Sequence, residues 1–380
     1  MTEKLYYIDA YTKEFDATVT SVKAEGYFYL VTLDRTAFFP TEGGQSADTG
    51  TLAGNRVLDV TERDGEIIHK LDGVVAVGDK VHGVIDFDAR FEKMQCHTAE
   101  HILCGIIHNL YGYNNVGFHL GDIVTFDIDS MLTREQLSEV ELLANRAVFD
   151  NLEVKAEFPS PDVLRTMSYR SKLDIYENVR IVKIGDIDSC ACCAPHVSRT
   201  GEIGLIKLLN SESHRGGVRI YMVAGYRALT DYNYRLNEER KISAILSVPQ
   251  GSLANGVEEQ NALLESARAT IKSMLLSSAR REAEALPETE GNVVKYFPDM
   301  NMDALREFSK CSSGKVSGIL VSLCGEEGDY KYVISSEQVN LREIVSDMNT
   351  ALCGKGGGRA EMLQGSFSAS LSEIEEYFGK

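Results

Sequence analysis

The 380-residue sequence predicts a multidomain α+β protein with a small N-terminal β-barrel, an α/β domain, a helical arm and a C-terminal α/β domain. Short β-prone runs separated by turn signals fill residues 1–88, whereas residues 231–286 have helical periodicity. Strand and helix patterns mix in the other two stretches. We therefore expect domains at residues 1–88, 89–230, 231–286 and 287–380.

The composition is typical of a soluble globular protein, with 43% hydrophobic and 25% charged residues. No apolar run approaches the roughly 18–20 residues that a membrane span needs, and the first residues lack the layout of a signal peptide. We expect a cytoplasmic protein with no membrane partner. The net charge of −18 opposes indiscriminate nucleic-acid binding, although it leaves room for a basic patch on one face.

The first domain is predicted as a barrel because its β-prone runs are short and regularly interrupted. Tyr27–Leu33 and Val81–Phe87 are rich in aromatic and β-branched residues. One loop, Phe38–Gly50, carries two adjacent glycines directly ahead of Gln45. Glycines let the backbone approach a ligand, and the Gln45 amide offers both a donor and an acceptor. A tight turn between strands explains the same residues equally well.

The second domain opens with a helix that carries two histidines. His97 and His101 are four residues apart, so both imidazoles project from one face, one turn apart. The apolar residues at helical spacing around them are Met94, Ala99, Ile102, Leu103, Ile106 and Ile107. One His-x3-His pair is common by chance, so the helix by itself indicates half of a metal site at most.

A second stretch, Cys190–His196, holds three of the eight cysteines in four positions. Such crowding indicates metal or thiol chemistry in a reducing compartment. Cys192 and His196 are again four apart, so they complete a tetrahedral zinc site with the two helix histidines. Cys190 or Cys193 in place of Cys192 stays open, as does a redox pair formed by those two flanking thiols.

The remaining elements of this domain are predicted from alternation and capping. Thr133–Gln136 has capping-box spacing and opens a helix, and Ser160-Pro161 marks another helix start. Strands are expected at 123–128, 180–184 and 216–224.

The arm is predicted as mostly helical, with a break at Val248–Gly251. Val257, Leu264 and Ile271 recur every seven residues. This spacing is typical of a dimer seam, so we expect a homodimer through the arm or the C-terminal domain.

In the last domain we expect strands at 293–297, 316–323 and 330–334, and helices at 341–352 and 371–378. The segment Gly354–Arg359 is glycine-rich and ends in arginine. Exposed backbone N–H groups with Lys355 and Arg359 could hold phosphate, but a flexible connector has the same composition. The segment lacks the order of a nucleotide P-loop.

Four motifs, taken together, resemble the alanyl-tRNA editing proteins of the AlaX family and the related editing domain of alanyl-tRNA synthetases. They appear in the family's order over nearly the whole chain, and the last resembles the DHHA1 domain of the longer members. The motifs are Phe38–Gln45, His97–His101, Cys192–Val197 with Thr200–Gly204, and Gly356–Arg359 with Gln364-Gly365.

The resemblance implies hydrolysis of the ester that joins a wrong amino acid, serine or glycine, to alanine tRNA, with that tRNA as partner. It implies one Zn²⁺ per chain on His97, His101, Cys192 and His196. Gln45, or a hydroxyl such as Thr36 or Thr41, is the candidate for holding the attacking water or for reading the serine side chain. The candidate tRNA-binding residues are Arg215, Arg219, Arg227, Lys355, Gly356, Gly357, Gly358 and Arg359.

One departure affects the pocket. The family's commoner pattern is Cys-x-Gly-Thr-His, whereas Cys193, Ala194 and Pro195 stand between the ligands here. Three alternatives remain: a zinc-dependent esterase acting on another aminoacyl-tRNA, an RNA-binding protein with a structural zinc, and a thiol oxidoreductase.

Overall fold

The computed structural model describes residues 1–121, 123–171 and 179–379. The chain forms two units, Met1–Glu238 and Glu239–Lys380. The predicted mixed α+β class is confirmed, since helices accompany several separate sheets. The finer division into four domains stays a prediction. Among the described residues, no helix has the length and apolarity that crossing a membrane requires.

The first unit begins with short elements and a closed barrel. β1 (Glu3–Lys4) pairs in parallel with β4 (Arg35–Thr36), and α1 (Leu5–Ile8) lies between them in sequence. In the first half of the long strand β2 alternate residues are buried, as expected for a strand with one face toward a core. The barrel order is β2 (Glu14–Glu25), β3 (Phe28–Leu33), β7 (Glu66–Leu71), β6 (Asn55–Arg63), β5 (Gly50–Leu52) and β8 (Lys80–Ile85).

The central element of this unit is α2 (Phe87–Tyr111), 25 residues long. Asp86 caps its N-terminus by accepting a hydrogen bond from the Ala89 N–H, and Gly112 ends it with a φ of 72°. Every residue from Met94 to Ile107 is buried, so the helix is surrounded by protein on all sides along this stretch. Its two histidines therefore lie deep inside the unit.

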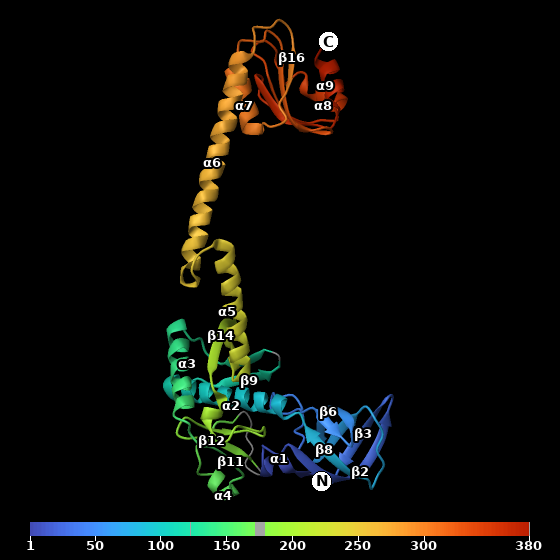
Figure 1. The fold of residues 1–380 in the computed structure, drawn as a ribbon, viewed down its shortest axis with the longest axis vertical. Coiled ribbons are helices and arrows are strands. Elements are labelled where there is room, and N and C mark those ends of the chain that lie inside the picture. Colours follow the sequence, from blue (N-terminus) through green and yellow to red (C-terminus); the bar gives the residue numbers. More distant parts are fainter. Residues whose placement is uncertain (122, 172–178, 380) are drawn as a thin grey trace. The chain divides into compact units, whose positions relative to one another are not determined.

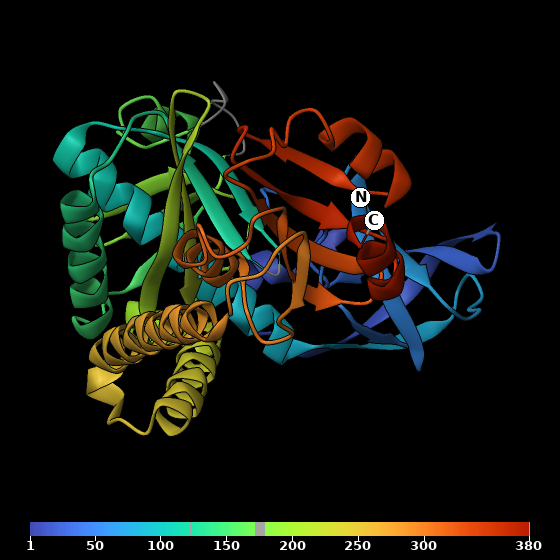
Figure 2. The same cartoon turned by 90° about the horizontal axis from the view of Figure 1, so that it is seen from above.

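Sheets and one further long helix enclose α2. An antiparallel sheet has the order β14 (Ile206–His214), β15 (Gly217–Ala224), β10 (Val124–Ile128) and β9 (Asn115–Leu120). A second has the order β11 (Val154–Glu157), β12 (Ile181–Ile184) and β13 (Asp188–Ala191). The helices are α3 (Arg134–Phe149), α4 (Pro161–Leu164) and the 3₁₀ turn η1 (Thr200–Ile203). Figures 1 and 2 both show the blue barrel at one end of this unit and α3 at the other.

Several local predictions for this unit are confirmed. α3 begins with the expected capping box, in which Thr133 and Gln136 satisfy each other's backbone N–H groups. The three strands expected in its second half are β10, β12 and β15, each within two residues of the predicted bounds.

The arm consists of α5 (Tyr226–Leu246), the turn η2 (Gln250–Ser252) and α6 (Leu253–Ala285). The predicted break at Val248–Gly251 falls between the two helices. Val257, Leu264 and Ile271 on α6 are 46%, 48% and 57% exposed, so the predicted seam is an uncovered apolar stripe within a single chain.

The second unit is built on a sheet with the order β16 (Val293–Tyr296), β17 (Leu320–Glu326), β18 (Asp329–Ser335), β20 (Met362–Phe367) and β19 (Lys355–Gly358). α7 (Met302–Cys311) and the end of α6 share one apolar cluster with Leu320. α8 (Val345–Ala351) and α9 (Leu371–Phe378) share another with Val321 and Leu323. Alternation along β17 therefore sends neighbouring side chains to opposite faces.

Three expectations for this unit were wrong, and one helix was not predicted at all. The strand predicted from 316 begins at Leu320, and the helix predicted from 341 begins at Val345. α7 was not predicted, although Asn301 caps it by accepting from the Ala304 N–H. The predicted glycine-rich loop is the edge strand β19, because it pairs with β20. A Cβ on Gly356 would lie 2.1 Å from the Tyr332 hydroxyl, so close packing requires that glycine.

Candidate metal centre and its cavity

The fold brings the four predicted ligands into one cluster. His97 and His101 come from α2, and Cys192 and His196 from the loop that follows β13. Their ligand atoms all lie within 4.8 Å of one another. Cys192 Sγ is 3.6 Å from His97 Nε2 and 3.3 Å from His196 Nε2. A tetrahedral zinc ion would set nitrogen and sulfur ligands about 3.5 Å apart, so the donor set fits such an ion.

Each imidazole is held by a partner on its other nitrogen. The Nδ1 atoms of His97 and His101 lie 3.0 Å from Gln45 Oε1 and 2.9 Å from Asp188 Oδ2. His196 Nδ1 lies 3.0 Å from the Thr98 hydroxyl, which itself donates to the Met94 carbonyl. In each of the three imidazoles the acceptor places the ring proton on Nδ1. The Nε2 lone pair of each ring is therefore available to a metal.

Electrostatics favour Cys192 as the thiolate ligand. Burial opposes its ionisation, but the surrounding histidines outweigh that effect and hold the pKa of the Cys192 thiol well below its usual range. Burial instead raises the pKa of Cys190 to about 11, and it raises the pKa of Cys193 as well. The cysteines are all free thiols.

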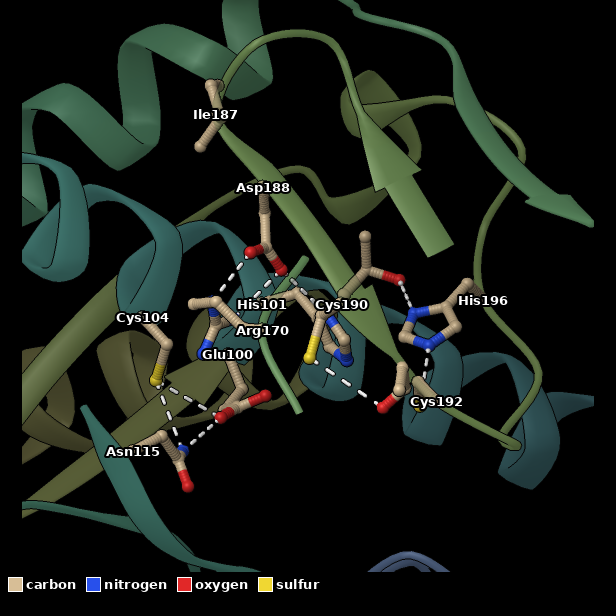
Figure 3. A network of polar contacts seen from close by, with 12 residues as sticks. Glu100, His101, Cys104, Asn115, Arg170, Ile187, Asp188, Cys190, Cys192 and His196 are labelled. Carbon is tan, nitrogen blue, oxygen red and sulfur yellow. Dashed lines mark hydrogen bonds and ion pairs between the residues drawn. The ribbon is translucent and has the colours of Figure 1, made fainter. Parts of the chain in front are cut away.

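A second group, His101 with Asp188 and Cys190, has ligand atoms equally close together. Its carboxylate, however, is already used. Arg170 donates to both oxygens of Asp188 at 2.7 and 2.9 Å, and His101 Nδ1 bonds to one of them (Figure 3). Burial opposes ionisation of Asp188, yet these hydrogen bonds lower its pKa. Asp188 therefore orients a ligand in the four-residue cluster.

A cavity of about 1350 Å³ lies beside the cluster, which is at the large end for a ligand site. Three of the four ligands line it, namely His97, His101 and Cys192. The rest of the lining is mixed and includes Lys4, Tyr7, Glu42, Gly43, Gly44, Glu100, Asn115, Phe118, Phe158, Arg170 and Arg180. An ester held here would lie against the metal ligands.

The barrel loop reaches the cluster through a tight turn. Gly43 and Gly44 have φ values of 61° and 83°, and Glu42 and Gln45 close the turn with two backbone hydrogen bonds. A Cβ on Gly44 would lie 2.7 Å from the Phe118 carbonyl of β9. The glycines thus serve both suggested purposes, a tight turn and a close approach, and the approach is to protein backbone.

Arg90 fixes that loop to the helix. Its guanidinium is fully buried and pairs with Asp48, while also donating to the carbonyls of Ala10 and Ala37. Asp48 in turn accepts from the Phe39 N–H at 2.6 Å. The start of α2 and the loop bearing Gln45 are thereby tied to one ion pair.

Comparisons with known proteins agree with this site. Residues 179–221, which include Cys192 and His196, match the model of the threonyl and alanyl tRNA synthetase second additional domain. Residues 3–89 match the model of tRNA synthetases class II (A). The alanyl-tRNA editing protein AlaX-L of Pyrococcus horikoshii is 30% identical, over 98% of this chain and 96% of its own.

This chain belongs to the family of alanyl-tRNA editing proteins. The alanine–tRNA ligase of Archaeoglobus fulgidus is 32% identical over 98% of the chain, which covers 43% of that ligase. The chain therefore spans less than half the length of this larger relative. The C-Ala domain of alanyl-tRNA synthetase from Aquifex aeolicus matches 24% of the chain and 91% of its own, with 19% identity and a TM-score of 0.20.

In this family member Gln45 and Thr36, both candidates for holding water, lie behind the site. Gln45 is fully buried, and its Oε1 accepts from the ring nitrogen of His97 that faces away from the cluster. Thr36 bonds to His69 Nε2 at 2.9 Å inside the barrel. Neither belongs to the described lining of the cavity. Their catalytic role stays a prediction, and the contacts favour a positioning role for Gln45.

The candidate tRNA-binding residues are differently engaged. Arg215 is exposed at the turn between β14 and β15. Arg219 pairs with Asp127 at 2.7 and 2.8 Å, and Arg227 pairs with Glu92 at 3.0 Å. In the second unit, Lys355 and Gly356 are exposed on β19. Gly357, Gly358 and Arg359 line a separate cavity of about 560 Å³.

Sequence reasoning missed the residues that orient the ligands. Asp188, Thr98 and Arg170 follow no spacing rule relative to the histidines, because their contacts come from the packing of separate elements. Arg180 was missed too. It donates to the carbonyls of Cys192 and Ala194 at 3.0 and 2.7 Å, and so holds the loop whose sequence departs from the family pattern.

Proposed function

We propose that this protein hydrolyses the ester of wrongly charged alanine tRNA, carrying serine or glycine, and holds one zinc ion on His97, His101, Cys192 and His196. Membership of the editing family supports the reaction class. The observation that carries the proposal is the four-ligand cluster with three oriented imidazoles at the wall of an open cavity. We also place the protein in the cytoplasm, which its free thiols support.

The chemistry requires a positioned ester and a water molecule. When bound, zinc supplies positive charge that polarises the ester or anchors the terminal ribose. Four protein ligands nearly saturate such an ion, which favours anchoring and orientation. Gln45, Asp188 and Thr98 keep the ligand rings in place, and Arg180 keeps the Cys192 backbone in place.

A second hydrolytic site has a physical rationale. A synthetase pocket for alanine cannot exclude glycine by size, and it rejects the extra hydroxyl of serine poorly. An editing site corrects both errors if it excludes alanine. We expect the mixed lining of the cavity to make that distinction.

For the tRNA body we propose contacts in the second unit, at Lys355, Gly356, Gly357, Gly358 and Arg359, and at Arg215 in the first. The exposure of Lys355, Arg359 and Arg215 supports this. Arg219 and Arg227 would first have to leave their ion pairs. We also propose a homodimer through the apolar stripe of α6, which light scattering of the purified chain would test.

The deciding experiment measures deacylation of alanine tRNA charged with serine, glycine or alanine, with and without a chelator. We expect rapid loss of serine or glycine, slow loss of alanine, and inhibition by the chelator that added zinc reverses. Cys192→Ser should lose both zinc and activity. Cys190→Ser is the matched control, since it removes a neighbouring thiol and should keep both. Equal hydrolysis of all three esters would contradict an editing function.

A further inference from the structure

Glu100 is a buried carboxylate that the chemistry above does not use. It is 5% exposed and stands three residues after His97, on the same face of α2. It lines the cavity together with His97 and His101. Its position is therefore within the site, beside the metal ligands, although its side chain bonds to none of them among the described residues.

Only one of its two oxygens is satisfied by the protein. The Cys104 thiol donates to Oε1 at 3.1 Å, and the Asn115 side-chain amide donates to the same oxygen. Figure 3 shows the other oxygen turned away from both donors. Among the described residues no group donates to Oε2 and no lysine or arginine pairs with Glu100. A buried carboxylate without a cation is costly unless a ligand supplies one.

The neighbouring amide of Asn115 determines which oxygen of Glu100 is occupied. Asn115 Nδ2 is fixed by Glu100 and by Cys104 Sγ at 3.2 Å, which assigns the amide orientation. Asn115 Oδ1 is buried and has no partner among the described residues. At this point of the cavity wall Glu100 Oε2 has no donor among the described residues, which suits a ligand group with several N–H donors.

The other carboxylates of the cavity are less suited to binding a cation. Both oxygens of Asp188 are occupied by Arg170 and His101. Glu42 and Asp186 are exposed, so water competes for them. Glu100 is the one described lining carboxylate that is both buried and without a cationic partner.

We propose that Glu100 binds the α-ammonium group of the aminoacyl ester, with its open carboxylate oxygen as the acceptor. This inference rests on the proposed function and names the residue that holds the amino acid's charged end. The α-ammonium is common to serine, glycine and alanine, so Glu100 positions the ester carbonyl without choosing among them. Choice of the side chain is left to the rest of the cavity.

The test compares two substrates that differ only in this group. One is seryl-tRNA(Ala), and the other is its α-hydroxy analogue, made by nitrous-acid deamination, in which a neutral hydroxyl replaces the ammonium. Single-turnover rates are divided by the uncatalysed rate of each ester. We expect the wild type to hydrolyse the amine-bearing ester roughly 10- to 150-fold faster, because this is the typical contribution of a hydrogen bond to a charged group. Glu100→Gln should lose that preference and keep its rate on the analogue within about 3-fold.

Glu42→Gln is the matched control, because it neutralises an exposed carboxylate in the same cavity and should keep the preference. Zinc content and thermal unfolding check that each variant is intact. Equal loss on both substrates in Glu100→Gln would assign Glu100 to structure or proton transfer and overturn the inference. Should that variant not fold, equal normalised rates of the wild type on both esters would overturn it. Failure of the wild type on both seryl- and glycyl-tRNA(Ala) would contradict the proposed function instead, and if only the glycyl ester is hydrolysed the same comparison is made with it and its α-hydroxy analogue.

Discussion

At the scale of single residues, the candidate metal centre depends on side chains that contact its proposed ligands. Each imidazole has one acceptor on Nδ1, supplied in turn by Gln45, Asp188 and Thr98. Such partners fix the tautomer and the ring orientation, and they raise the basicity of the ligand nitrogen. The contribution of these residues should therefore be visible in metal affinity before it is visible in the fold.

Replacing Gln45 by alanine tests this directly. His97 would lose its Nδ1 acceptor, so we expect zinc affinity to fall by roughly 10- to 100-fold, with deacylation following zinc occupancy. Competition with a chromogenic chelator measures the affinity. Thr36→Ala is the control, since it removes a hydroxyl inside the barrel and should leave zinc binding unchanged. Unaltered affinity and activity in Gln45→Ala would rule out this role.

His69 gives the barrel a dependence on pH. Burial lowers its pKa to about 4, against about 6.5 when unfolded, and the Val31 carbonyl offsets this only in part. Because the unfolded chain then binds more protons, stability should fall as pH drops from about 6.5 to 4, by about 3 kcal/mol in all. The free energy of unfolding, measured with denaturant at several pH values, should fall in this way for the wild type and not for His69→Gln. Parallel curves would show that His69 titrates normally in the folded barrel.

At the scale of elements, α2 organises the first unit. It contributes two ligands, Thr98, Glu100 and the buried end of Arg90. Gly105 allows the chain before β13 to approach, since a Cβ there would lie 2.5 Å from the Ile187 carbonyl. Asp188 is thereby brought within 2.9 Å of His101. This close contact positions α2 against the strand β13, which precedes the loop carrying Cys192 and His196.

The Arg90–Asp48 pair should be the strongest single electrostatic link in this arrangement. Removing one partner leaves an uncompensated buried charge, so we expect Asp48→Asn to cost about 3–5 kcal/mol in the free energy of unfolding. It should also weaken zinc binding, because the loop carrying Gln45 loosens. The exposed pair Arg56–Asp72 is the control, and Asp72→Asn should cost far less stability because water screens that pair. Similar losses in the two variants would contradict the importance of burial.

At the scale of the whole molecule, the two units have separate cores. The largest cluster of the first unit draws on α2, α3 and the sheet β14-β15-β10-β9. The largest cluster of the second unit draws on its own sheet with α8 and α9. Loss of metal should therefore be felt in one unit only.

Chelation of the metal tests this separation. We expect deacylation to fall to near background and the thermal transition of the first unit to shift down, because four ligands lose their common ion. The apolar core should keep the unit folded, so far-UV circular dichroism at 25 °C should change little. Differential scanning calorimetry should show an unchanged transition temperature for the second unit. Complete unfolding of the first unit on chelation would favour a purely structural metal.

The sequence predicts the candidate ligands better than it predicts the residues around them. The cluster of His97, His101, Cys192 and His196 was predictable because helical periodicity and zinc chemistry each impose a spacing within one stretch of chain. The mixed fold class and the capping box at Thr133 were predictable for the same reason, since their signals are local.

Only the tertiary structure decided which residues stand behind those ligands and which face the cavity. Gln45, a candidate for holding the attacking water, is buried against His97. Lys355–Gly358 form a strand because β20 lies beside them, a pairing that local composition does not encode. Glu100 adjoins His101 in sequence, yet its open oxygen follows from where Cys104 and Asn115 lie. Local sequence thus specifies the chemical groups, and long-range packing determines the direction in which each one acts.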